Sequence, residues 1–166
     1  MLKDITVGEA QKLTAPAPFG LLSTLRSDGA TNLMAVSWWT YLSNHPPMLG
    51  VCLSNKGLSG ALIRENGEFV LSVVGENLSQ EALGCGRCSG RDENKAEKLN
   101  IALEKSTVVK PEYVKNSRVV FECVLKSCAE ASDHTLYMGE IVAVHGDSGV
   151  KQLFAYNGYS MLGPVE

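Results

Sequence analysis

The sequence predicts a mainly β fold, a β-barrel with accessory helices. Strand-like segments outnumber helix-like ones by about two to one, and hairpin-type connections dominate. Two of the strand-like runs, residues 118–129 and 135–145, are long for an open sheet and usual in coiled or barrel sheets. The chain has 166 residues, 45% of them hydrophobic, which is the size of one domain with its own core. We therefore expect residues 1–166 to form a single domain.

The N-terminal third is expected to hold a short helix and three strands. A helix over residues 3–13 is followed by Ala15-Pro16-Ala17-Pro18, which forces an extended chain. Strands over residues 19–26 and 31–39 meet at Ser27-Asp28-Gly29, because Asp-Gly between two β-prone runs signals a hairpin. After Asn44-His45-Pro46-Pro47, residues 48–53 form an almost continuously apolar strand suited to burial on both faces.

The middle of the chain is expected to hold three helices and one strand, and the last third to return to strands. A helix should run from about Gly57 to Asn66, since Leu58, Ala61 and Leu62 share one face and Asn66-Gly67 is a stop signal. Residues 84–94, rich in Gly and charge, are expected to form an exposed loop. The other expected helices cover residues 79–83 and 95–103, and the other expected strands cover residues 68–74, 108–109, 118–129, 135–145 and 152–156.

Charge and composition exclude several classes of partner. The net charge is −3, with 15 basic and 18 acidic residues and no block of like charges, so we expect no nucleic-acid or membrane partner. The N-terminus lacks the basic and apolar regions of a signal peptide, and no apolar run approaches the roughly 18 residues of a membrane span. A cytoplasmic location follows. The five cysteines, an odd set, are then expected to be reduced thiols.

The turn Ser54-Asn55-Lys56-Gly57, placed directly before a helix, has the groups of an anion site. It offers a hydroxyl, an amide, an ammonium and free backbone N–H groups where the helix dipole is positive. Ser59 adds a hydroxyl from the first helical turn. A phosphate dianion would fit this arrangement. The alternative is that Ser54 or Asn55 only caps the helix.

The preceding strand, Thr31-Asn32-Leu33-Met34-Ala35-Val36-Ser37, alternates small polar and apolar residues and leads into Trp38-Trp39. Small residues would let a flat heteroaromatic ring lie along the backbone and use its N–H and C=O groups. The alternatives are that the tryptophans pack in the core and that Asn32 only flanks the turn.

Two further motifs carry chemistry. Cys85-Gly86-Arg87-Cys88 has the spacing of a dithiol or of half a metal site, but no second such pair or paired His accompanies it, so we expect no metal. Asp133-His134 is an acid–imidazole pair that could donate to, or protonate, a ligand in a cleft; the alternative is a turn with an exposed His. The sequence has no G-x-G-x-x-G or Walker-type fingerprint, so a Rossmann nucleotide site is not expected.

In this order along the chain, these motifs resemble the flavin reductase-like, FMN-binding split-barrel family, in particular its flavoredoxin-like branch. The similarity runs from about Phe19 to Gly163. The residues that carry it are Asn32 to Ser37, Pro46-Pro47, Cys52 to Lys56, Leu62 to Phe69, Ser89-Gly90-Arg91-Asp92, Asp133 to Leu136 and Gly139 to Val144.

This resemblance implies a split β-barrel of the Greek-key type and a homodimer with FMN near the subunit interface. Asn32, Leu33, Met34, Ala35, Ser37 and Trp38 would lie along the isoalloxazine and ribityl groups. Leu53, Ser54, Asn55, Lys56 and Ser59 would surround the phosphate, with Arg91 as a further contact. Asp133 and His134 match an element associated with nicotinamide handling, which makes NAD(P)H a transient donor. Ser132 stands where many members of the family have Gly.

The resulting functional prediction is an FMN-binding oxidoreductase, an NAD(P)H-dependent flavin or ferric reductase. The alternative is a flavoredoxin-type electron-transfer protein that holds FMN tightly, has no NAD(P)H turnover of its own and exchanges electrons with a redox partner protein. A third hypothesis, a thiol or metal protein built on Cys85 and Cys88, predicts a colourless protein.

Overall fold

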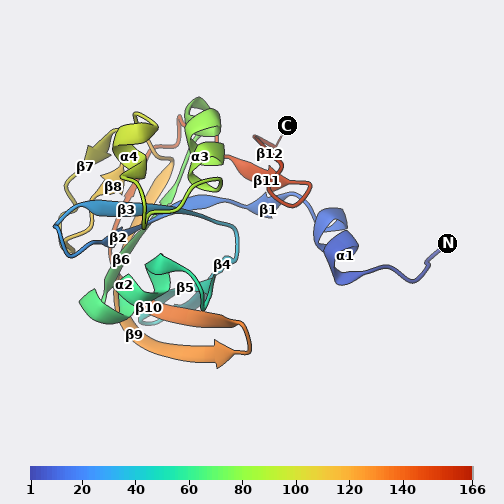
Figure 1. The fold of residues 1–166 in the computed structure, drawn as a ribbon, viewed down its shortest axis with the longest axis horizontal. Helices are drawn as coiled ribbons and strands as arrows, with labels where there is room; N and C mark the ends of the chain where they lie inside the picture. Colours follow the sequence, from blue (N-terminus) through green and yellow to red (C-terminus); the bar gives the residue numbers. More distant parts are fainter. Residues whose placement is uncertain (166) are drawn as a thin grey trace.

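The computed structural model describes residues 1–165, and its largest element is a seven-stranded antiparallel sheet (Figure 1). The strand order is β3-β2-β6-β9-β10-β5-β4. The strands are β2 (Gly20–Leu25), β3 (Thr31–Val36), β4 (Trp39–Asn44), β5 (Pro47–Ser54), β6 (Glu68–Val73), β9 (Val119–Ala131) and β10 (His134–Gly146).

The two edge strands of this sheet, β3 and β4, are consecutive in the chain. Only Ser37 and Trp38 separate them. Three Cα–Cα steps reach at most about 11 Å, so the sheet must curl until its edges approach each other. Within residues 1–165, β3 pairs with β2 and β4 pairs with β5, but β3 and β4 do not pair with each other. The result is a barrel that is split along one seam.

This seam corrects the prediction of one strand over residues 31–39. Val36 pairs with Gly20 of β2, whereas Trp39 pairs with Val51 of β5. The chain leaves one edge of the sheet and joins the other at Ser37 and Trp38. The local sequence is β-prone throughout, so the change of pairing partner has no local signal.

Helices and two small sheets surround the barrel. The helices are α1 (Val7–Leu13), α2 (Leu58–Asn66), η1 (Glu76–Leu78), α3 (Ser79–Cys85) and α4 (Lys95–Lys98). The remaining strands are β1 (Ala17–Pro18), β7 (Leu103–Glu104), β8 (Tyr113–Val114), β11 (Phe154–Tyr156) and β12 (Met161–Gly163). In Figure 1, α3 and α4 lie beside β3, while α1 projects away from the barrel.

Some predicted elements differ from the structure, and some observed strands were not predicted. The helix expected over residues 95–103 ends at Lys98, because Asn100 adopts a left-handed φ of 53°. The strand expected at Val108-Val109 is wrong: these residues lie in a loop, and the nearby paired strands are β7 and β8. The unexpected strands are β1, β7, β8, β12 and residues 40–44 of β4. The helix stop at Gly67 is confirmed, with φ at 70°.

The core consists of two main clusters on either side of the sheet. One fills the barrel and includes Leu22, Val51, Ile63 and Phe69. The other lies under α3, α4 and the C-terminal strands, and includes Leu33, Ala82 and Leu153. Within residues 1–165, none of the helices combines the length and apolar character that a membrane-spanning helix requires.

Candidate functional site

The pairing of β5 with β10 brings the two polar motifs together. His134 lies opposite Ser54 in the register of these strands. The backbone N–H of Asn55 donates to the carbonyl oxygen of Asp133 at 2.9 Å. The anion turn and the Asp133-His134 pair are thus direct neighbours, although almost 80 residues separate them in the sequence.

The first turn of α2 carries no side-chain cap. Gly57 is the N-cap residue and makes no side-chain cap hydrogen bond. The Asn55 amide instead donates to the Ser132 carbonyl at 2.9 Å and accepts from the Thr135 hydroxyl at 2.7 Å. The hypothesis that Ser54 or Asn55 only caps the helix is therefore wrong. The N–H groups of this helix end are left for another acceptor, such as an anion.

The buried side chain of Asn32 contacts Ser59 in the first turn of α2. The Asn32 side chain is only 4% exposed, and its Nδ2 donates to Thr24 Oγ1 at 3.0 Å and to Ser59 Oγ at 3.0 Å. Ser59 thus receives a hydrogen bond from Asn32 and keeps its own O–H to donate. The structure thus brings the predicted residues Asn32 and Ser59 together, and the two side chains hydrogen-bond to each other.

The loop over residues 86–91 lies against this buried pair. A Cβ at Gly90 would collide with Oδ1 of Asn32, so only glycine allows the loop to approach this closely. The Arg91 guanidinium donates to the Lys56 carbonyl at 3.0 Å. The Arg91 guanidinium therefore lies beside the start of α2, against the backbone of the residue that carries the Lys56 ammonium.

The other end of the candidate site is the seam at Ser37 and Trp38. The Trp38 ring, 46% exposed, lies 4.9 Å from the His134 ring, at an interplanar angle of 37°. The Ser37 hydroxyl oxygen is buried and has no hydrogen-bond partner within residues 1–165. An unpartnered buried hydroxyl is costly, so Ser37 Oγ marks a position where a ligand atom would be favourable.

Tyr159 is a site residue that the sequence did not indicate. Its hydroxyl accepts a hydrogen bond from the Ser37 backbone N–H at 3.1 Å. The ring borders a recess of about 180 Å³ that Ser37 and Trp38 also line, and a recess of about 70 Å³ that Ala35 and Arg87 line. Tyr159 thus divides the space along the end of β3. No motif surrounds it, and only the C-terminal fold brings it there.

Three of the apolar residues predicted for the site have side chains in or against the core. Leu33 and Leu53 are buried, and Met34 packs against the barrel core. Only their backbone atoms can face a ligand. Because β3 is an edge strand, one side of its backbone is free to do so.

Charge at the site is set by Asp133 and its neighbours. His134 Nδ1 lies 2.8 Å from Asp133 Oδ1. This hydrogen bond, the charge of His134 and the nearby Lys56 hold the pKa of Asp133 below its usual range. Asp133 is therefore an anion at neutral pH and fixes the orientation of the imidazole.

The cysteine pair does not have the features of a reactive dithiol. Cys85 is buried, and burial raises the pKa of its thiol to about 12, which disfavours the thiolate form. Cys88 donates from Sγ to the Gly84 carbonyl at 3.4 Å. All five cysteines are free. Within residues 1–165, no cluster of three or more His, Cys, Asp or Glu side chains is placed to hold a metal ion.

A protein-family model and several relatives each match most of this chain. The flavin reductase like domain model matches residues 13–162. An uncharacterized protein of Archaeoglobus fulgidus is 39% identical over 118 residues, which is 70% of this chain and 67% of the relative. A flavin reductase of Pseudomonas putida is 27% identical over 138 residues, 82% of this chain and 77% of the relative.

Solved structures agree on the fold. The flavoredoxin of Desulfovibrio vulgaris (Miyazaki F) has a TM-score of 0.88 at 24% identity, covering 100% of this chain and 94% of that one. An FMN-binding protein from Thermus thermophilus has a TM-score of 0.84 at 21% identity, covering 99% and 93%. With nearly the whole chain matched by the domain model, the chain belongs to the flavin reductase-like family and has that family's split β-barrel fold.

Proposed function

We propose that this protein, with residues 1–166 as one domain, is a cytoplasmic FMN-dependent oxidoreductase, an NAD(P)H-dependent flavin or ferric reductase. The observation that carries the proposal is the uncapped N-terminus of α2, with Lys56 and Arg91 beside it. An anionic group there would meet free N–H donors and two cations. Membership of the flavin reductase-like family supports FMN phosphate as that group.

The residues around the turn fit a phosphate. Ser54 and Lys56 are accessible on the turn, and the Ser59 hydroxyl is held by Asn32 with its own hydrogen free to donate. Arg91, fixed by the Lys56 carbonyl, adds charge without direct competition from a carboxylate. Asn55 and Leu53 hold the turn in place, the first through Ser132 and Thr135 and the second as part of the core.

The seam fits a flat polar ring. Ser37 offers an unpartnered Oγ, and the free edge of β3 offers backbone groups at Asn32 to Ala35. Trp38 offers a half-exposed aromatic face. Bound FMN would supply a ring that takes up a hydride or electrons and passes them on. Backbone N–H donors beside that ring would stabilise negative charge on it.

Asp133 and His134 are proposed to act on the donor side. Asp133 accepts a hydrogen bond from His134 Nδ1 and so leaves Nε2 of the imidazole to face a ligand. The Trp38 ring packs against the imidazole in a tilted arrangement and so restricts its movement. Together they would orient NAD(P)H as a transient donor and hold a proton at His134.

A homodimer with FMN near the interface is also proposed. Trp38, Tyr41 and Leu42, which follow the seam, are 46%, 63% and 40% exposed. Exposed aromatic and aliphatic side chains are typical of interfaces between subunits. A second subunit at this face would lie directly beside the proposed ring site.

The alternative function is a flavoredoxin-type carrier that exchanges electrons with a redox partner protein. The accessible Trp38 beside His134 favours it, because electrons can leave through an exposed aromatic edge. Steady NADH or NADPH oxidation with added FMN or a ferric chelate would support the reductase. A yellow protein reduced only by a protein donor would support the carrier.

The phosphate assignment is tested by Lys56→Ala and Ser54→Ala. Each should weaken FMN binding by about tenfold or more, because a hydrogen bond to a charged group contributes about 1.5–3 kcal/mol. FMN fluorescence quenching on titration measures the affinity. Lys105→Ala removes an exposed lysine elsewhere and should leave it unchanged. Unchanged FMN affinity in both turn variants, or a protein that binds no FMN at all, would overturn the proposal.

A further inference from the structure

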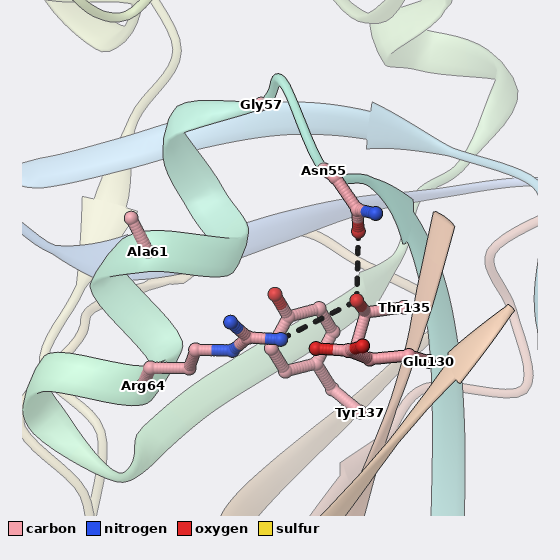
Figure 2. Close-up of a pocket in the computed structure, with 7 residues that line it drawn as sticks. All are labelled: Asn55, Gly57, Ala61, Arg64, Glu130, Thr135 and Tyr137. Carbon is pink, nitrogen blue, oxygen red and sulfur yellow. Dashed lines mark hydrogen bonds between the residues drawn. The ribbon is translucent and has the colours of Figure 1, made fainter. Parts of the chain in front are cut away.

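A cavity of about 470 Å³ lies beside the turn Ser54-Asn55-Lys56-Gly57. Figure 2 shows it between α2 and the turn end of the β9–β10 hairpin, where Glu130 pairs with Thr135. Its volume is in the range of small-molecule sites. Of the residues proposed to hold FMN, only Asn55 lines it. The full lining is Asn55, Gly57, Ala61, Arg64, Glu130, Thr135 and Tyr137.

Arg64 carries the positive charge of this cavity, and two contacts position its guanidinium. Its guanidinium lies over the Tyr137 ring, 5.5 Å from the ring centroid, and donates to Thr135 Oγ1 at 3.4 Å. Figure 2 shows the side chain reaching from α2 across that ring. None of the ion pairs within residues 1–165 involves Arg64. A guanidinium has five N–H donors, so most of them remain for a ligand.

The neighbours of Arg64 are built to hold that orientation. Thr135 is fully buried and donates its hydroxyl hydrogen to Asn55, which leaves its oxygen to accept from Arg64. The Tyr137 hydroxyl fits against Gly60, where any Cβ would collide with it. The small residues Gly57 and Ala61 keep the α2 side open. Pre-organised donors of this kind lower the entropy cost of binding.

Arg64 requires an anionic group on the ligand, and Glu130 adds a second requirement. Its carboxylate lies on the cavity wall together with Arg64, without forming an ion pair with it. A simple anion would be attracted by Arg64 and repelled by Glu130. A ligand that also carries a hydrogen-bond donor would satisfy both groups.

We propose that this cavity binds a small organic oxyanion that carries a hydroxyl or other hydrogen-bond donor, with Arg64 holding the oxyanion and Glu130 accepting from the donor. Both carboxylates and phosphates provide the oxyanion that a guanidinium binds in bidentate fashion. The site is separate from the seam, and the proposal does not depend on FMN binding. Asn55 and Gly57 of the anion turn also line this cavity. An occupant would therefore contact Asn55, the residue that links the anion turn to the Ser132–Asp133 turn.

The test is a backbone amide chemical-shift titration at constant ionic strength with three probes: 3-hydroxybutyrate, butyrate and glycerol 3-phosphate. The expected result is saturable shifts at Asn55, Ala61 and Thr135, with 3-hydroxybutyrate binding more tightly than butyrate. Tighter binding of glycerol 3-phosphate than of 3-hydroxybutyrate would identify phosphate as the natural oxyanion. The reverse would identify a carboxylate.

Two variants of the cavity should change the affinity for oxyanions in opposite directions. Arg64→Gln should weaken binding of 3-hydroxybutyrate and glycerol 3-phosphate by at least tenfold. Glu130→Gln should tighten binding of butyrate and reduce the preference for the hydroxylated probe. Spectra of both variants that overlay on the parent away from the cavity would exclude misfolding. Lys56→Gln removes a cation outside this cavity, so it should leave 3-hydroxybutyrate binding unchanged even if FMN binding is lost.

The proposal would be overturned by saturable shifts confined to residues 32–38 and 87–91, by the absence of any saturable shift, or by equal affinities in the parent and Arg64→Gln. Loss of 3-hydroxybutyrate binding in Lys56→Gln would also overturn it, because the oxyanion would then occupy the anion turn. Failure of FMN binding with retention of these shifts would count against the proposed function alone.

Discussion

Ser132 occupies the first position of the two-residue turn that joins β9 to β10, since Ala131 and His134 form the last pair of the hairpin. Its φ is 55°, in the left-handed region that glycine adopts without steric cost. Tight hairpin turns with positive φ at this position favour glycine for that reason. The serine therefore holds the Asp133-His134 pair in place at a cost in backbone strain.

Ser132→Gly should raise the free energy of unfolding by about 1 kcal/mol, because it relieves the left-handed strain. Urea denaturation followed by circular dichroism measures the change. Asn116, at φ 58°, is the matched control. Asparagine tolerates the left-handed region better than serine, so Asn116→Gly should raise the free energy of unfolding by less than Ser132→Gly. A lower unfolding free energy for Ser132→Gly would show that the serine side chain stabilises the turn.

At the scale of elements, one buried carboxylate organises a loop. Glu122 of β9 is fully buried and accepts hydrogen bonds from the backbone N–H groups of Thr107 at 2.8 Å, Val108 at 2.7 Å and Val109 at 3.2 Å. His145 of β10 lies 2.9 Å from it through Nε2. These contacts use the N–H groups of residues 107–109, which is why the strand predicted there does not form.

Glu122→Gln should destabilise the protein by about 2–3 kcal/mol, because it weakens several hydrogen bonds to a buried charge. Burial by itself would raise the pKa of Glu122, but hydrogen bonds from Thr107, Val108 and His145 lower it from 4.5 to about 2. The stabilisation from ionised Glu122 is therefore complete above pH 4.5 and is lost as the pH falls from 4.5 towards 2.

Urea denaturation at a series of pH values tests this effect. Between pH 4.5 and 2, the unfolding free energy of the parent should fall more than that of Glu122→Gln. The difference between the two unfolding free energies should therefore become smaller in acid. Glu65→Gln, at an exposed glutamate, should follow the parent. A difference that stays constant with pH would contradict the assignment to the ionised carboxylate.

Elements with a local physical signal could be predicted from the sequence, and those set by distant contacts could not. Asp28-Gly29 predicted the β2–β3 hairpin, and Gly67 predicted the end of α2, because both depend on backbone freedom at a single residue. The break at Ser37 and Trp38 depends on which strand each residue pairs with. The positions of Tyr159 and Arg64 depend on packing between segments far apart in the chain.

At the scale of the whole molecule, α1 is set apart from the barrel. The helix has a capping box between Thr6 and Glu9 but buries no residue, and Figure 1 shows it projecting from the body. Val7 and Leu13 are 77% and 74% exposed. A helix of seven residues is marginal alone in water, so we expect its apolar side chains to be covered in the proposed homodimer.

The double variant Val7→Ser with Leu13→Ser should weaken dimerisation by at least tenfold, because each side chain contributes about 1.5–3 kcal/mol when fully buried. Sedimentation equilibrium measures the dissociation constant. Since α1 contributes nothing to the core, the far-ultraviolet spectrum of the barrel should be retained. Lys3→Ser, a polar change in the same segment, is the control. An unchanged dissociation constant in the double variant would exclude α1 from the interface.

The contact between the Trp38 and His134 rings also gives the protein an intrinsic optical reporter. An imidazole in contact with an indole quenches its emission, so the emission of Trp38 will report movement of the His134 ring relative to it. The only other tryptophan is Trp39, which packs near Tyr41 and Phe121 and would be removed by Trp39→Phe. Rapid-mixing fluorescence could then time events at the Asp133-His134 pair without an added dye.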